Sequence, residues 1–144
     1  MKIAIASDHA GFELKEFLRK NFTDVEWLDF GPSNADRTDY PDYAAKVAQH
    51  VAKQSGSLGV LVCGSGIGMC IAANKFAGIR AAVVESEQTA KLAKAHNNAN
   101  ILCLGARILD PNRAKEILKA WLETPFEGCR HQDRIAKIAK LDPK

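Results

Sequence analysis

The stretch from Leu58 to Lys75, which reads LGVLVCGSGIGMCIAANK, limits the possible folds of this chain more than any other segment. A short apolar run rich in β-branched residues ends at Cys63, three glycines follow at alternate positions from Gly64 to Gly68, and small or apolar residues continue towards Lys75. This order predicts a buried strand, a glycine turn and a helix. Backbone N–H groups converge at the start of such a helix and favour an anion, so a cysteine at this place is expected to act as a thiolate.

Other interpretations of this stretch have to be weighed against that one. A free cysteine at a strand end is usually a small buried apolar residue, and only the glycines make chemistry an equal alternative. A dinucleotide site would use Glu85 to hold a ribose, but its glycines follow the spacing GxGxxG, whereas these read GxGxG. A cysteine phosphatase loop needs an arginine where Met69 stands, and a signalling receiver domain needs an aspartate in place of Cys63. A nucleotide- or flavin-binding module therefore stays open as the alternative from a different functional class.

The rest of the chain is predicted to alternate between strands and helices. Strands are expected at residues 2–6, 25–30, 58–63, 80–84 and 101–104. Helices are expected at residues 11–20, 43–53, 67–75, 87–95 and 111–123, the last two with Ser86 and Asp110 as N-caps. A further amphipathic helix at residues 132–141 would pack on the domain or on a partner subunit.

This alternation implies right-handed crossovers and a parallel sheet with helices on both faces, which is a three-layer Rossmann-like α/β fold. We expect five strands in the order 2-1-3-4-5 and a helical tail at the C-terminus. Ligands of such sheets bind beyond the carboxyl ends of the strands, where the strand order reverses. In the expected order this point lies between the first and third strands, which lead into residues 7–9 and 63–65. Asp8, His9 and Cys63 should therefore surround one crevice.

Composition narrows the class of protein further. The 144 residues are 47% hydrophobic and contain no repeat, so we expect a single domain over residues 1–144. The 20 Lys and Arg residues are interspersed with 17 Asp and Glu residues, which argues against nucleic acid as a partner. No segment is typical of a signal peptide or a membrane span, so a cytoplasmic protein is expected. Its four cysteines should then be free thiols, and the lack of a CxxC pair argues against zinc.

Five segments of the sequence together resemble one known family. They read SDHAGFELK, RTDYPDYA, CGSGIGMCIAANKFAGIRAA, AHNNANILCLGAR and GCRHQDR, and they run in order through nearly the whole chain. These segments closely resemble ribose-5-phosphate isomerase B, whose superfamily also includes galactose-6-phosphate isomerase subunits and enzymes active on allose 6-phosphate. Some relatives lack the cysteine and are thought to use a carboxylate elsewhere as the base. Because this chain keeps Cys63, it looks like the cysteine-base branch.

The resemblance implies a cofactor-free aldose–ketose isomerase of the pentose phosphate pathway that passes through a cis-enediolate. Cys63 would be the base, and the turn from Gly64 to Gly68, with the Ser65 hydroxyl, would form the anion hole for the enediolate. His96 would assist ring opening with Asp8 nearby. The full set of substrate-binding residues that the resemblance implies is Asp8, His9, Tyr40, Gly64, Ser65, Gly66, Ile67, Gly68, Asn97, Arg107, Arg130 and Arg134.

The resemblance also implies how the phosphate is held and how the chains assemble. His9, Arg107, Arg130 and Arg134 would bind the phosphate, and the last two stand four residues apart, so they would share one helix face. Family members are dimers or tetramers with sites between subunits, so a homodimer or tetramer is expected. The preferred substrate stays open between ribose 5-phosphate and a hexose 6-phosphate of the allose or galactose type.

Overall fold

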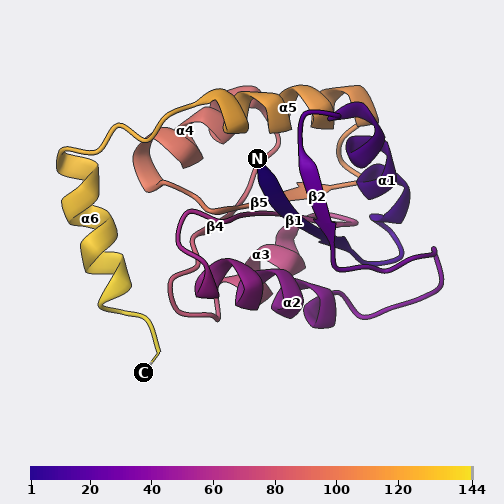
Figure 1. Ribbon diagram of the computed structural model, residues 1–144, viewed down its shortest axis with the longest axis horizontal. Coiled ribbons are helices and arrows are strands. Elements are labelled where there is room, and N and C mark those ends of the chain that lie inside the picture. The colour runs from indigo at the N-terminus through magenta and orange to yellow at the C-terminus, as the bar shows by residue number, and fades with distance from the viewer. Residues whose placement is uncertain (144) are drawn as a thin grey trace.

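The computed structural model describes residues 1–143 and folds them around a five-stranded sheet, as Figure 1 shows. The strands are β1 (Lys2–Ser7), β2 (Glu26–Asp29), β3 (Leu58–Cys63), β4 (Ala81–Val83) and β5 (Ile101–Gly105). The helices are α1 (Phe12–Asn21), α2 (Tyr40–Lys53), α3 (Ile67–Ala73), α4 (Glu87–Asn97), α5 (Pro111–Glu123) and α6 (Arg130–Ala139). Every neighbouring pair of strands is parallel. The predicted three-layer α/β fold is therefore confirmed.

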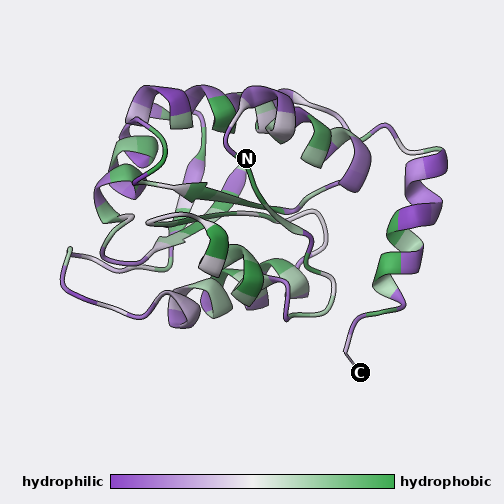
Figure 2. Ribbon diagram, turned by 180° about the vertical axis from the view of Figure 1, so that it is seen from behind, coloured by the Kyte–Doolittle hydropathy of each residue, from purple (hydrophilic) through white to green (hydrophobic). Residues whose placement is uncertain are grey.

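Helices cover both faces of the sheet because successive side chains of a strand point to opposite faces. On one face, Ile3 and Ile5 of β1 belong to a buried cluster that α1, α4 and α5 complete. On the other face, Ala4 and Ala6 belong to a second buried cluster, which α2 and α3 complete. In Figure 2 the strands are largely apolar, whereas the helices alternate between apolar and polar residues. Two separate cores thus hold the sheet, one on each face.

The strand order is β2-β1-β3-β5-β4, so the expected order 2-1-3-4-5 was wrong in its last two strands. All five residues of β5 are buried, and this strand pairs with β3 on one side and with β4 on the other. β4 has only three residues, none of them fully buried. A short, partly exposed strand suits the edge of a sheet, where one side needs no partner, whereas a fully apolar strand suits the interior.

The corrected order makes β3 the strand at which ligands are expected to bind. The helices that follow β1 and β5 lie on one face of the sheet, whereas α3, which follows β3, lies on the other. At the carboxyl end of β3 the chain therefore turns to one face of the sheet, whereas at the ends of the two neighbouring strands it turns to the other face. Such points of divergence leave a crevice beyond the strand ends. Cys63, the last residue of β3, stands at the middle of it.

Two helices differ from the predicted boundaries in ways that matter for the site. α2 begins at Tyr40 instead of residue 43, because Pro41 fits the first turn of a helix, where its missing N–H is not needed. Tyr40 is therefore helical, and not part of a loop. α6 begins at Arg130 and projects from the side of the molecule in Figure 1. Its Ile135 is buried, but Ile138 is exposed. No helix within residues 1–143 is long and apolar enough to cross a membrane.

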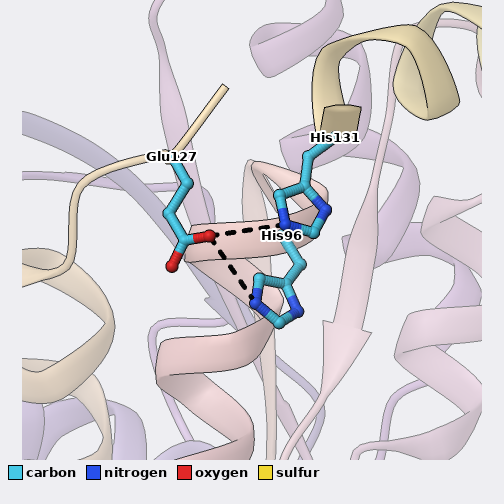
Figure 3. Close-up of side chains that lie close together, drawn as sticks. All are labelled: His96, Glu127 and His131. Carbon is cyan, nitrogen blue, oxygen red and sulfur yellow. Dashed lines mark ion pairs between the residues drawn. The ribbon is translucent and has the colours of Figure 1, made fainter. Parts of the chain in front are cut away.

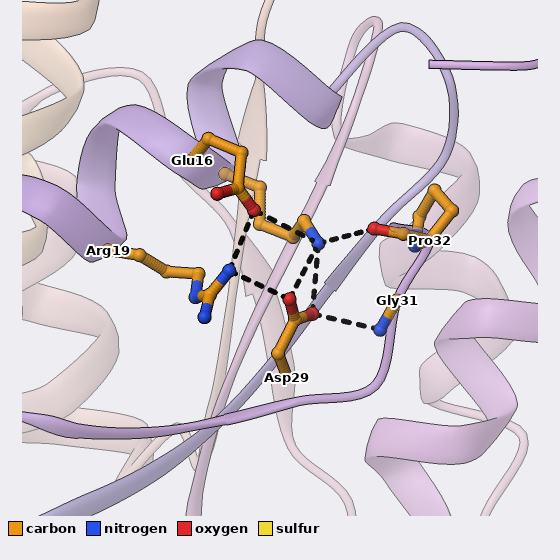
Figure 4. A network of polar contacts seen from close by, with 6 residues as sticks. Glu16, Arg19, Asp29, Gly31 and Pro32 are labelled. Atoms are coloured by element: carbon orange, nitrogen blue, oxygen red, sulfur yellow. Dashed lines mark hydrogen bonds and ion pairs between the residues drawn. The ribbon is translucent and has the colours of Figure 1, made fainter. Parts of the chain in front are cut away.

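A buried lysine connects α1 to the segment that leads from β2 to α2 (Figure 4). Lys15 is fully buried, and its Nζ donates to both carboxylate oxygens of Asp29, at 2.9 and 3.0 Å, and to the carbonyl oxygen of Pro32 at 2.7 Å. Arg19 adds an ion pair to Asp29 at 2.9 Å. All three protons of the ammonium group are thus used. This network fixes the start of the loop that runs over the end of β1 towards Tyr40.

Candidate active site

A cavity of about 580 Å³ opens at the carboxyl end of β3. Its lining includes Asp8 from the end of β1, Cys63 from the end of β3 and Arg107 from the segment after β5. The other lining residues are Tyr40, Gly64, Ser65, Ile67, Gly68, Ile71 and Ile108. The structure therefore brings Asp8 and Cys63 to one crevice, as the topology predicted. His9 is next to Asp8 in the chain but is not among the lining residues.

The sulfur of Cys63 is almost completely buried and is held by the glycine turn. Only 4% of the residue is exposed, and the backbone N–H of Gly66 donates to its Sγ over 3.1 Å. Gly66 has φ of 79°, and a Cβ there would lie 3.0 Å from the carbonyl carbon of Leu104. Glycine is therefore needed both for the backbone conformation and for the close packing against β5. The N–H of Gly66 therefore holds the sulfur of Cys63 in place at the wall of the cavity.

The polar residues after β1 are held by hydrogen bonds to the backbone. Asp8 is buried, and its Oδ1 accepts from the backbone N–H of Gly11 at 3.0 Å. The ring nitrogen Nδ1 of His9 lies 3.2 Å from the carbonyl oxygen of Thr38 and 3.3 Å from its nitrogen, so it donates or accepts according to its tautomer. His9 is thus held by the loop that the Lys15 network fixes.

Two large side chains lie directly on the glycine turn. A Cβ on Gly64 would lie 3.2 Å from Nη1 of Arg107, and a Cβ on Gly68 would lie 2.6 Å from the ring of Tyr40. The backbone N–H of Arg107 also donates to the carbonyl oxygen of Gly64 at 2.9 Å. These glycines therefore make room for the guanidinium and the phenol beside Cys63. The Ser65 hydroxyl, which accepts from the N–H of Ile67 at 3.2 Å, completes this side of the cavity.

The remaining candidate residues lie near the opposite, amino-terminal ends of the strands. His96 and Asn97 end α4, shortly before β5 begins, whereas Cys63 pairs with Gly105 at the far end of β5. The length of β5 alone separates the two places by roughly 13 Å. Arg130 and Arg134 lie on α6, which packs against the end of α4. One chain therefore presents two groups of candidate residues that do not meet.

Two residues that were not predicted from the sequence lie beside His96 (Figure 3). The rings of His96 and His131 are stacked, with centroids 4.3 Å apart and planes inclined by 11°. Oε2 of Glu127 lies 3.4 Å from Nε2 of His131 and 3.8 Å from Nε2 of His96. Burial lowers the pKa of His131, and the charges of His96 and Arg130 act in the same direction. The sequence carried a signal only for His131, which lies within the GCRHQDR segment, whereas Glu127 directly precedes that segment.

The same three residues form the one group within residues 1–143 whose ligand atoms are close enough to suggest a metal ion, all within 4.8 Å of one another. Their geometry does not fit one. The lone pair of an imidazole nitrogen lies in the plane of its ring, and the nearly parallel planes of His96 and His131 do not meet at a common point. The arrangement therefore suits a stack of two rings beside a carboxylate.

The four cysteines are free thiols in different environments. Cys70 is only partly buried, and its Sγ lies 3.4 Å from the carbonyl oxygen of Ala81. A hydrogen bond with Cys103 lowers the pKa of Cys70 to about 7, against the opposing effect of burial. Cys103 is buried, and burial raises its pKa. Cys129 is exposed.

Comparison with known proteins gives a consistent result. The family model described as ribose/galactose isomerase matches residues 3–138. Ribose-5-phosphate isomerase B of Escherichia coli is 43% identical over 99% of this chain and 97% of its own length. The crystal structure of a ribose 5-phosphate isomerase from Thermotoga maritima is 48% identical and superposes with a TM-score of 0.93 over 96% of this chain and 97% of that one. Ribose-5-phosphate isomerase B of Mycoplasma genitalium, solved with bound ribulose-5-phosphate, is 44% identical with a TM-score of 0.93 over 97% and 95% of the two chains.

Proposed function

Because this chain belongs to the ribose/galactose isomerase family and is therefore an isomerase, we propose that it interconverts ribose 5-phosphate and ribulose 5-phosphate through a cis-enediolate, with Cys63 as the base. The observation that carries this proposal is the hydrogen bond from Gly66 to the buried sulfur of Cys63, at the wall of an open cavity. The relative from Mycoplasma genitalium, with ribulose-5-phosphate bound, supports the substrate class. The resemblance found in the sequence is thereby confirmed at the level of the family.

The chemistry follows from the residues of the cavity. Once the sugar is linear, the Cys63 thiolate removes the proton from C2, the electron pair forms the C1–C2 double bond, and the negative charge moves to O1. The backbone donors of the glycine turn stabilise this charge, which develops only along the reaction. We assign to Ser65 the transfer of the proton from O2 to O1. The Cys63 thiol then returns its proton to C1, which completes the ketose.

We further propose that the complete site forms between two copies of this chain. Cys63, Asp8, Ser65, Tyr40 and Arg107 of one protomer would face His96, Asn97, Arg130 and Arg134 of its partner. The separation of the two groups within one chain supports this arrangement. So do the apolar side chains around the cavity, because Ile67, Ile71 and Ile108 are 53%, 60% and 55% exposed. Contiguous exposed apolar side chains are typical of a surface that is covered in the assembled protein.

In the shared site the phosphate would be bound from both sides. Arg107 and His9 would approach it from one protomer, and Arg130 and Arg134 would approach it from the partner. Tyr40, whose ring lies on Gly68, would contact the sugar. We place this homodimer in the cytoplasm, where free sugar phosphates are converted. A hexose 6-phosphate is the second candidate substrate, because the family description also includes galactose isomerases.

The proposal is tested with purified protein and a panel of ribose 5-phosphate, allose 6-phosphate and galactose 6-phosphate. We expect turnover of ribose 5-phosphate and solvent exchange of the transferred proton. Cys63→Ala should lower both by about 10²–10⁴-fold without unfolding the protein. Cys70→Ala is the matched control and should leave turnover close to normal. Near-normal turnover by Cys63→Ala would exclude the cysteine base, and binding of a flavin or NAD without any isomerase activity would favour the nucleotide-binding alternative.

A further inference from the structure

Glu127 and His131, which lie beside His96, have no role among the residues assigned so far. We propose that Glu127 and His131 are positioning residues, which hold the His96 ring in the orientation needed to open the furanose of ribose 5-phosphate. This inference rests on the proposed function and on the ring-opening role of His96 that the family resemblance implies. It adds two residues, Glu127 and His131, which contact His96 of the same chain.

His131 restricts the movement of the His96 ring. The side chain of His96 is 38% exposed, so by itself it is free to rotate about its terminal torsion. His131 is only 6% exposed and lies flat against it, with the two centroids 4.3 Å apart. Burial and the nearby positive charges of Arg130 and Arg134 favour the neutral form of His131 by lowering its pKa. A neutral neighbour suits this place, because two charged imidazolium rings in a stack would repel each other.

Glu127 fixes which nitrogen of His96 faces the substrate. Its backbone N–H donates to the carbonyl oxygen of Ala95 at 3.0 Å, so the residue is tied to the last turn of α4. Its carboxylate lies 3.8 Å from Nε2 of His96, which is longer than a hydrogen bond and short enough for a strong interaction once that ring is charged. Nε2 therefore faces Glu127, and Nδ1 is the nitrogen left for the sugar.

Ring opening then proceeds with all protons accounted for. Nδ1 of His96 takes the proton from the C1 hydroxyl, and the electron pair of that O–H bond forms the C1–O1 double bond. The C1–O4 bond breaks, and its electron pair goes to O4. The imidazolium returns the proton to O4, which leaves the linear aldose and a neutral His96. The charge of Glu127 stabilises the imidazolium between the two transfers.

The two substrates separate ring opening from the later steps. Ribose 5-phosphate is mostly a closed furanose, whereas ribulose 5-phosphate stays linear because its 5-hydroxyl carries the phosphate. His96→Asn should therefore impair turnover of ribose 5-phosphate severely, while exchange of the C1 proton from ribulose 5-phosphate survives better. We expect Glu127→Gln and His131→Ala to show the same difference, with ribose 5-phosphate turnover reduced about 10-fold or more. His131→Phe retains a stacked ring and should recover part of this loss. Glu123→Gln, an equal change of charge at the exposed end of α5, should have no effect.

Double variants decide whether the two residues act through His96. In the His96→Asn background, Glu127→Gln should cause no further loss, because the group that it positions is already gone. Equal losses of Glu127→Gln in the two assays, or losses that multiply with those of His96→Asn, would overturn the positioning role. If His96→Asn itself reduces both assays equally, the ring-opening function of His96 is wrong, and that outcome is distinguishable from the failure of Glu127 and His131 alone.

Discussion

The backbone N–H of Gly66 points at the sulfur of Cys63 and donates to it over 3.1 Å. This contact depends on a left-handed backbone conformation, with φ of 79° at Gly66. Any side chain at Gly66 would also press against Leu104 and Val83. The position of the Gly66 N–H thus depends on the packing between the turn and the neighbouring strands. A substitution at Gly66 can therefore displace this donor while Cys63 itself stays unchanged.

Gly66→Ala is expected to reduce both stability and turnover. The left-handed conformation costs a non-glycine residue about 1–2 kcal/mol, and relief of the contact with Leu104 would move the N–H away from Cys63. Gly56→Ala is a matched control, because Gly56 has the same φ of 79° and nothing within 4 Å of an added Cβ. It should lose stability in denaturant titration and keep full activity. Equal activity of the two variants would mean that the N–H of Gly66 has no role in the reaction.

Gly68→Ala should change stability and substrate binding in opposite directions. Gly68 lies inside α3, where alanine is favoured over glycine by about 1 kcal/mol. The added Cβ would lie 2.6 Å from the Tyr40 ring, which therefore has to leave its place over the turn. We expect unchanged or higher thermal stability together with a raised KM. In a Tyr40→Ala background the same substitution should no longer affect KM, and a persistent effect there would contradict the assigned position of Tyr40.

Lys15→Met should destabilise the protein strongly, although it lies outside the cavity. Removal of one partner from a buried ion pair typically costs about 3–5 kcal/mol, and the remaining contact between Arg19 and Asp29 should keep the loss near the lower end. Because the network fixes the loop that holds His9, ribose 5-phosphate should also bind less tightly. Lys20→Met changes an exposed lysine of the same helix and should be nearly neutral. Urea titration of both variants, with KM measured in parallel, checks this expectation.

A mixture of Cys63→Ala and Arg134→Ala chains should recover activity that neither variant has alone. If the site is shared, a mixed dimer contains one intact site and one with both defects. Random exchange of subunits then restores up to about one quarter of wild-type activity. Exchange has to be verified, for example with differently tagged chains. Absence of recovery in a verified mixed dimer would show that each site is complete within one chain.

Cys70 should react with iodoacetamide at neutral pH. Its pKa is lowered to about 7, so labelling followed by peptide mass spectrometry should reach half of its maximal rate near that pH. Cys103→Ala should shift this midpoint upwards, because the hydrogen bond with Cys103 is the largest cause of the lowered pKa.

The stability of the protein should also depend on the ionisation of Cys70. Because the pKa of Cys70 is lower in the folded protein than in the unfolded chain, the thiolate stabilises the fold at pH values above the unfolded pKa of 9.0. This stabilisation is lost as the pH falls through about 7. Cys70→Ala should therefore destabilise the protein more at pH 8.5 than at pH 6.

The segment from β3 to α3 was the part of the fold that the sequence predicted best. β3 ends at Cys63 and α3 begins at Ile67, as expected, because a buried run followed by glycines leaves little choice of boundary. The order of β4 and β5 could not be read in this way. Both strands are short and apolar in sequence, and only the pairing of β5 with two neighbours shows which one lies inside the sheet.

The candidate site was predictable where it follows from topology. Asp8 and Cys63 end two adjacent strands, so their place in one crevice follows from the fold class. The stack of His96 and His131 brings together side chains 35 positions apart, from the end of one helix and the start of another. No periodic pattern encodes such a contact, because it depends on how α6 docks against α4.

The placement of the two groups at opposite ends of the strands has a genetic consequence if the proposed dimer shares its sites. A chain that carries both Cys63→Ala and Arg134→Ala would then inactivate both sites of a dimer with a normal partner, one through each defect. Such a chain would be dominant over the wild type when both are expressed in one cell. Chains with a single defect would instead complement each other between alleles, so dominance and complementation would both follow from one molecular arrangement.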